Sequence, residues 1–161
     1  MLQTQAIAPG TLSVLKTLME IPELHSFHLV GGTALALKYS HRTSIDLVHY
    51  PHPMIYPVEL RDTIRIYDDR DLIAMKLQTI LSRGQKKDFW DIAELMHFYD
   101  LSQMIDFHKA KYPNQMLLIS IPQALVYFND AEDSDEPVSL KGQTWRDVKE
   151  VIKDKVREFL S

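Results

Sequence analysis

Cysteine is absent from this chain of 161 residues. Its absence excludes disulfide bonds, cysteine-ligated zinc and thiol nucleophiles from any site. No uninterrupted apolar run approaches the roughly 18 residues that span a bilayer, so the sequence predicts no membrane-spanning segment. Residues 1–10 lack the basic region and apolar run of a secretory signal, and we therefore expect a cytoplasmic location.

An excess of basic residues is absent as well. Lys and Arg total 18 against 22 Asp and Glu, which gives a formal net charge of −4 with His neutral. Proteins that bind nucleic acid through their overall charge are basic, so any such contact here must come from a local patch. Apolar residues make up 45% of the chain and charged residues 25%, which is the balance of a folded globular domain and excludes a disordered chain.

The first 67 residues carry alternating helical and extended patterns. In order, they predict a helix over 11–21, a strand over 27–30, a helix over 33–39 and strands over 44–50 and 63–67. The prolines between 51 and 57 exclude a regular central strand there, because proline cannot donate to the strand ladder. We interpret residues 1–67 as a small α/β part.

The remaining residues, 68–161, are predicted to be mostly helical. The expected helices cover 70–82, 87–99, 102–112 and 145–160. Residues 114–128 are apolar on several sides and are interrupted by Pro122, which predicts a broken, buried helix. Residues 129–137 carry five acids and predict an exposed loop. The fold class is therefore α+β, with both parts packed as one compact unit.

Gly31-Gly32-Thr33 lies between a predicted strand and a predicted helix. Glycines at that place let the backbone approach a ligand, and the start of the helix offers free N–H groups to an anion. A tight strand-to-helix turn without any ligand is the alternative interpretation.

Asp46 lies near the start of the strand predicted over 44–50, and strand alternation puts Asp46 and Val48 on one face. A carboxylate so close to a Gly-Gly turn is suited to hold a magnesium ion near a phosphate. A surface Asp46 that pairs with Arg42 is the alternative.

Lys76 lies inside the apolar arc of its predicted helix, at four-residue spacing from Leu72 and Ile80. A lysine in that position must either extend to solvent or meet an anion, such as a phosphate in a cleft.

Arg83, Lys86 and Lys87 form the densest basic cluster and are the candidate contact for nucleic acid or a triphosphate. Asp88 follows them, either as a helix cap or facing a groove. The seven histidines form no metal motif, and His41 is interpreted as an orienting or structural residue.

Together these stretches resemble a known family. Residues 29–37 (LVGGTALAL), followed by His41-Arg42-x-Ser44-x-Asp46, closely resemble the opening motif of the AbiEii/AbiGii toxin family. Residues 71–77 and 83–91 resemble its later motifs, and residues 127–132 and 145–149 resemble the C-terminal part of one branch. This family has the nucleotidyltransferase fold of the DNA polymerase β type. The resemblance implies a small mixed sheet of that type with a C-terminal helical bundle.

The family contains the toxin halves of type IV toxin–antitoxin systems, several of which act in phage defence. The resemblance therefore implies transfer of a nucleoside monophosphate from an NTP to an RNA acceptor such as tRNA, with Mg²⁺ as cofactor and an antitoxin as partner. The roles that it implies are nucleotide binding for Gly31, Gly32, Thr33, Arg42 and Ser44, metal binding for Asp46, phosphate neutralisation for Lys76, and a base or orienting role for Asp88.

Two departures from the family pattern concern the strand that contains Asp46. The family has Asp-x-Asp there, whereas this chain has Val48 at the second position. Relatives place several tens of residues before a Tyr-Pro-x-Pro segment, whereas residues 48–53 follow Asp46 almost at once. We expect a trimmed sheet and a weakened or absent transferase activity.

Two alternatives to an active transferase remain at this stage. One is a degenerate pseudoenzyme that only binds a nucleotide, RNA or an antitoxin. The other is a structural or oligomerising module that uses the apolar C-terminal helices.

Overall fold

The computed structural model describes residues 2–44 and 53–161, and it shows a mixed α/β chain that is mostly helical. Asp46, Val48 and most of the strand predicted over 44–50 lie outside the described residues. The elements are η1 (Thr4–Ala6), α1 (Pro9–Glu20), η2 (Pro22–Leu24), α2 (Gly31–Tyr39), β1 (Glu59–Arg61), β2 (Ile64–Ile66), α3 (Asp69–Ser82), α4 (Lys86–Leu95), α5 (Leu101–Lys111), α6 (Ile121–Val126), α7 (Asn129–Glu132) and α8 (Trp145–Leu160).

The described sheet is a two-stranded antiparallel hairpin, in which Leu60 pairs with Arg65. Its turn consists of Asp62 and Thr63, which both have positive φ, at 47° and 71°. Left-handed conformations at both turn residues give the strands the twist that a two-residue hairpin needs. The strand predicted over 63–67 is confirmed as β2. Its partner β1 was not predicted, because three residues carry too little periodicity.

The strand predicted over 27–30 is reduced to one parallel pairing with β2. The Leu29 amide donates to the Arg65 carbonyl at 2.7 Å, and the Tyr67 amide donates to the Leu29 carbonyl at 3.1 Å. Pairing ends there because Gly31, with φ of 69°, already begins α2. The Arg65 side chain secures the preceding loop by donating to the Met19, Leu24 and Phe27 carbonyls.

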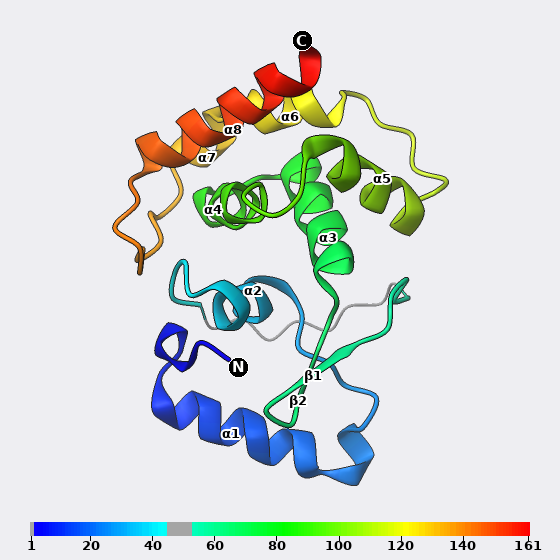
Figure 1. The fold of residues 1–161 in the computed structure, drawn as a ribbon, viewed down its shortest axis with the longest axis vertical. Helices are drawn as coiled ribbons and strands as arrows, with labels where there is room; N and C mark the ends of the chain where they lie inside the picture. The colour runs from blue at the N-terminus through cyan, green and yellow to red at the C-terminus, as the bar shows by residue number, and fades with distance from the viewer. Residues whose placement is uncertain (1, 45–52) are drawn as a thin grey trace.

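Helix α3 lies at the centre of the molecule, between the N-terminal elements and the other helices (Figure 1). It packs against α2, α4, α5 and α6, while α8 packs against α4, α5 and α6. The Asp68 side chain caps its start by accepting from the Arg70 amide at 2.9 Å. Because α2 contacts both α3 and α4, the two parts of the chain touch directly.

Residues 114–128 do not form the buried, broken helix that the sequence predicted. Residues 113–120 form an exposed loop, in which Met116 is 94% and Leu118 102% exposed. Pro122 lies in the first turn of α6, where its missing N–H would have no helical partner, and Ser120 caps that helix. The prediction was wrong because proline began a helix here instead of interrupting one.

Aromatic side chains join α4 to the C-terminal helix. Trp90 stacks on Trp145 with ring centroids 6.1 Å apart, and Phe89 meets Phe128 at 5.2 Å. Helix α8 buries Trp145, Val148, Ile152 and Val156, the spacing of one helical face. The loop predicted over 129–137 contains the short helix α7, and its remaining residues form a loop before α8.

No helix in the described ranges, 2–44 and 53–161, is both long enough and apolar enough to cross a membrane.

Candidate functional site

The Gly31-Gly32-Thr33 turn packs tightly against the segment that follows α2. A Cβ atom on Gly32 would overlap Nη2 of Arg42 and lie 3.1 Å from Oγ of Ser44. The hydroxyls of Thr33 and Ser44 are 3.4 Å apart. The fold therefore brings the predicted nucleotide-binding residues together, and the absent side chain at Gly32 makes room for the Arg42 guanidinium.

Arg42 is held by a carboxylate from α4. Its Nε donates to Oδ1 of Asp91 at 2.7 Å, and its Nη2 donates to Oδ2 at 2.8 Å. This two-point geometry fixes the plane of the guanidinium as well as its position. His41 contributes a third contact, between its Nε2 and Oδ1 of Asp91 at 2.7 Å. This contact is compatible with the orienting or structural role that the sequence suggested for His41.

Lys76 meets carboxylates of its own protein. Its Nζ lies 2.8 Å from Oδ1 of Asp88 and 2.6 Å from Oδ2 of Asp91. The other oxygen of Asp88 accepts the Gln85 amide at 3.0 Å, which caps the start of α4. Lys76 is only 7% exposed, so it does not extend to solvent. Its ammonium charge is already balanced by these two acids, both of which are buried.

The electrostatics of this network favour the charged forms of Asp91 and Lys76. Burial alone would raise the pKa of Asp91, but the Lys76 and Arg42 charges hold that pKa well below its usual range. Burial alone would lower the pKa of Lys76, yet Asp91 and Asp88 raise it above its usual value. We call Arg42, His41, Lys76, Asp88 and Asp91 the buried ionic network. A network of this kind tolerates the loss of a member poorly, because a buried charge is then left without a partner.

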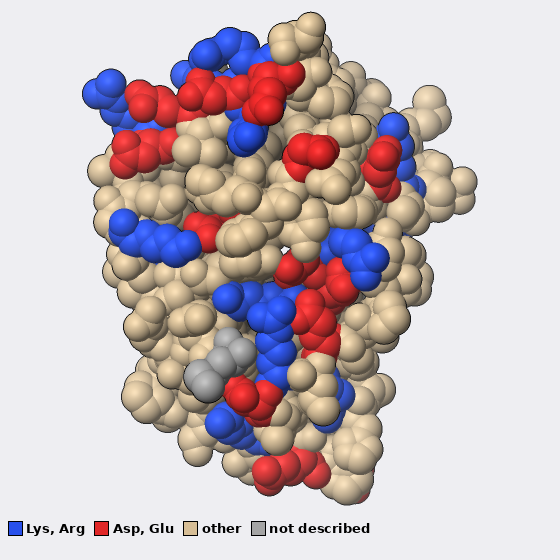
Figure 2. All heavy atoms as spheres, viewed as in Figure 1, with Lys and Arg blue, Asp and Glu red and all other residues tan. Residues whose placement is uncertain are grey.

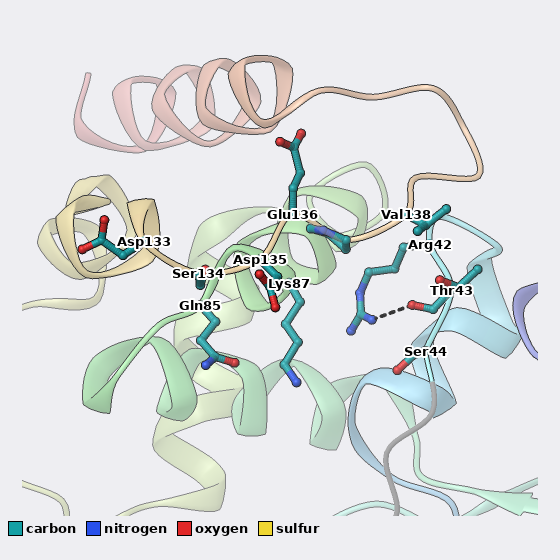
Figure 3. A pocket seen from close by; sticks show the side chains of 11 residues that line it. Arg42, Thr43, Ser44, Gln85, Lys87, Asp133, Ser134, Asp135, Glu136 and Val138 are labelled. Carbon is teal, nitrogen blue, oxygen red and sulfur yellow. Dashed lines mark hydrogen bonds between the residues drawn. The ribbon is translucent and has the colours of Figure 1, made fainter.

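A polar cavity of about 430 Å³ adjoins this network (Figure 3). One wall consists of Arg42, Thr43 and Ser44 from the segment after α2, with Gln85 and Lys87 at the start of α4. The opposite wall is the loop over 133–138. In Figure 3 the Arg42, Ser44 and Lys87 side chains surround one gap between α4 and the segment after α2. Asp133, Asp135 and Glu136 from the opposite wall line the same space, so the cavity carries charges of both signs. Its side with Arg42, Lys87 and Ser44 is the part that suits an anionic group.

The predicted basic cluster is divided by the fold. The Lys86 ammonium donates to the Glu132 and Ser134 carbonyls at 2.9 and 2.8 Å, so Lys86 holds the acidic loop across the start of α4. Lys87 lines the cavity, whereas Arg83 is exposed outside it. Figure 2 shows acidic and basic side chains intermixed over this view of the surface, without a broad basic area.

Magnesium is the cofactor that the resemblance implies. Within residues 2–44 and 53–161, no group of three or more His, Asp or Glu side chains is arranged to hold a metal ion. The magnesium site stays a prediction, because Mg²⁺ needs only one or two carboxylates besides substrate phosphates and this finding concerns larger clusters among the described residues. The predicted ligand, Asp46, lies outside them.

Sequence reasoning missed Asp91 as the centre of the network, and it missed Gln85 and the loop over 133–138 as walls of the cavity. One signal was present for Asp91. Asp88 and Asp91 are three residues apart, which puts them on one face of α4, and Lys76 lies in an apolar arc that requires an anion or an exit. No comparable signal marked the loop, because its contact with α4 spans 48 residues.

Comparison with known proteins gives one relative. A protein of Aquifex aeolicus (strain VF5), described as "Uncharacterized protein aq_aa25", is 29% identical over 187 residues, covering 84% of this chain and 89% of that protein. Because 187 exceeds the 161 residues of this chain, the aligned part of that protein contains residues that this chain lacks. No protein-family model matches the chain. No solved structure matches it either.

Proposed function

We propose that this protein is a nucleotidyltransferase-like toxin component of a type IV toxin–antitoxin or phage-defence system. It binds an NTP in the polar cavity and transfers the NMP to an RNA acceptor such as tRNA. The observation that carries this proposal is the position of Arg42 and Ser44, which line one cavity together with Lys87. A volume of about 430 Å³ is within the range of small-molecule sites, roughly 300–1,000 Å³.

The proposal includes a nucleotidyltransferase-type sheet, a C-terminal helical bundle, a cytoplasmic location and an antitoxin partner. The β1–β2 hairpin, the parallel pairing of Leu29 and the contacts of α8 with α4, α5 and α6 are compatible with that architecture.

In the proposed reaction, the acceptor hydroxyl oxygen forms a bond to the α-phosphorus of the NTP. The bond from that phosphorus to the bridging oxygen breaks, pyrophosphate leaves with the electron pair, and the hydroxyl proton passes to a base. Lys87 would offset part of the charge of the bound phosphates, and the Ser44 hydroxyl would donate to a phosphate oxygen. Arg42 would form the wall beside them, with its own charge balanced by Asp91. Asp46 is the residue that would hold Mg²⁺, which would supply polarisation of the phosphoryl group and the attacking hydroxyl.

A second candidate is a binding module that has lost transfer, as the resemblance itself allows. Lys76 and Asp88 favour it, because both are committed to the buried ionic network. Lys76 would have to leave two carboxylates to reach a phosphate, and Asp88 would have to leave Lys76 to accept a proton. Val48 also favours the binding module, because it stands where the family has a second acid.

One assay distinguishes the two candidates. The protein is incubated with Mg²⁺, labelled NTPs and total tRNA, beside an Asp46→Ala variant, and its melting temperature is measured with and without NTP. Label incorporation that depends on Asp46 supports the transferase. A melting temperature raised by NTP without label incorporation supports the binding module. The absence of both effects, label incorporation and a raised melting temperature, would reject both candidates.

The cavity itself is tested by a pair of lysine variants. Lys87→Met should abolish the NTP-dependent rise in melting temperature, because Lys87 lines the cavity. Lys16→Met, on α1, replaces a lysine outside the cavity and should leave that rise unchanged. Equal responses of the two variants would place the nucleotide elsewhere.

A further inference from the structure

A second concave surface lies at the other end of α8 from the polar cavity. It is a groove of about 620 Å³ between α5, α6 and the end of α8. Its apolar lining includes Leu117, Ile121, Val126, Val156, Phe159 and Leu160. Helix α8 has 16 residues, so its two ends are about 24 Å apart. The groove therefore has no part in the proposed nucleotide site.

The loop that joins α5 to α6 projects beside this groove. Residues 112–120 read Tyr-Pro-Asn-Gln-Met-Leu-Leu-Ile-Ser and contain no charged residue. The side chains of Met116, Leu117, Leu118 and Ile119 are all exposed. In Figure 1 this loop runs along the outside of the helical part to the start of α6, close to the C-terminal end of the chain. An apolar projection thus lies next to an apolar hollow.

The exposed apolar area is larger than that of an ordinary monomer surface. The four loop residues together with Val126, Phe159 and Leu160 expose from 39% to 102% of their surfaces. Counted over whole residues, backbone included, these fractions amount to roughly 800 Å², against about 300–600 Å² for the largest apolar patch on a typical monomer. Each partner in a standard stable interface contributes about 800 Å². The patch therefore has the size of one half of a protein interface.

The charges near the groove decide which occupant fits it. Lys109 pairs with Asp106 at 3.6 Å, and Arg157 on α8 pairs with Asp154 at 3.1 Å. Lys155 likewise pairs with Glu158 at 2.9 Å. These helices present balanced charge to a partner and give no attraction to a strongly acidic or basic segment. An uncharged apolar segment is the complementary occupant, and the loop over 112–120 has that chemistry.

We infer that this face binds a second copy of the chain, with the 112–120 loop of each copy seated in the groove of the other. A projection and a hollow that lie side by side on one surface are self-complementary about a two-fold axis. Such an interface closes after two copies. It buries the loop side chains that are exposed in one chain alone.

The mass of the protein in solution tests this inference. Light scattering after size-exclusion chromatography should give about twice the chain mass of 18.7 kDa at micromolar concentrations. Leu118→Glu should give a monomer, because two charges would be buried without partners. Leu60→Glu, at a position 71% exposed on β1, is the matched control and should remain dimeric. Circular dichroism should show both variants folded.

Several outcomes would overturn the inference. A wild-type monomer at all concentrations would mean that another kind of protein, or none, covers the groove. A dimer that survives Leu118→Glu, or growth beyond two copies, would contradict the closed interface.

The absence of native cysteine allows a direct test of the loop-to-groove contact. Met116→Cys in one tagged copy and Phe159→Cys in a differently tagged copy should form a mixed disulfide under mild oxidation. Leu60→Cys in place of Met116→Cys should not form it. A dimer that gives no disulfide with the loop cysteine would disprove this arrangement of the two chains.

Discussion

Asp91 accepts two parallel hydrogen bonds from Arg42, from Nε at 2.7 Å and from Nη2 at 2.8 Å, across 49 residues of sequence. The same carboxylate contacts His41 at 2.7 Å and Lys76 at 2.6 Å. One acid on α4 thus joins the segment after α2 to the centre of α3. The cavity wall formed by Arg42 depends on a residue that does not itself line the cavity.

Asp91→Asn should destabilise the protein strongly. The variant leaves Arg42 and Lys76 with fewer negative partners in a buried site, and breaking such a pair costs about 3–5 kcal/mol. Urea unfolding measures the loss. Asp106→Asn, in an exposed pair on α5, is the control and should change the free energy of unfolding by less than about 0.5 kcal/mol. Similar effects of the two variants would contradict the assigned importance of the network.

The contribution of Asp91 should depend on pH in the acid range. Its pKa is lower in the folded protein than the usual value of 3.8, so the folded state favours the carboxylate. The resulting stabilisation is fully present above pH 3.8, the usual pKa. It is lost as the pH falls further, through the lower pKa that Asp91 has in the folded protein. The difference in unfolding free energy between wild type and Asp91→Asn should therefore be constant above about pH 5 and shrink toward about pH 2. A constant difference across this range would refute the assignment.

Gly32→Ala should disturb the cavity wall. The added Cβ would overlap Nη2 of Arg42, and that nitrogen cannot move freely because Asp91 holds it. We expect a loss of about 1–3 kcal/mol in unfolding free energy, the usual cost of overpacking. NTP should also protect this variant less well against thermal unfolding. Gly10→Ala, where nothing lies within 4 Å of the new Cβ, should be neutral or stabilising.

Asp71→Ala should release the segment before β1. Asp71 accepts the Tyr56 amide at 2.9 Å and the Ile55 amide at 3.1 Å, and it pairs with Lys111, which also donates to the Pro53 carbonyl. Hydrogen exchange of the Ile55 and Tyr56 amides should become faster. Asp68→Ala removes the cap of α3 and should cost about 1 kcal/mol without changing exchange at these two amides. Unchanged exchange in Asp71→Ala would show that other contacts hold the segment.

Local patterns predicted most of the helices. The apolar periodicity behind the helices predicted over 70–82 and 145–160 acts within one or two turns, so nearby residues suffice to indicate it. The same local reasoning failed at Pro122, since proline is tolerated at the start of a helix and disruptive inside one. It also missed β1, whose three residues pair only through the following turn.

Candidate site residues were predicted from sequence as residue types, but not as partners. Lys76 was recognised because a cation in an apolar arc is unusual, yet its partners Asp88 and Asp91 come from another helix. Gly32 was recognised as part of a turn, whereas its contact with the Arg42 side chain became visible only in the fold.

By itself, the sequence determined the absence of thiol chemistry, the helical character of the second part and the presence of a Gly-Gly turn before a helix, because composition and short spacing carry those properties. Tertiary structure alone decided that Arg42 pairs with Asp91 and that acids of the same chain balance the charge of Lys76. It also decided that the apolar residues of the 112–120 loop are exposed to solvent. The physical reason is that charge pairing and burial depend on contacts between segments far apart in the sequence, and local periodicity carries no information on those contacts.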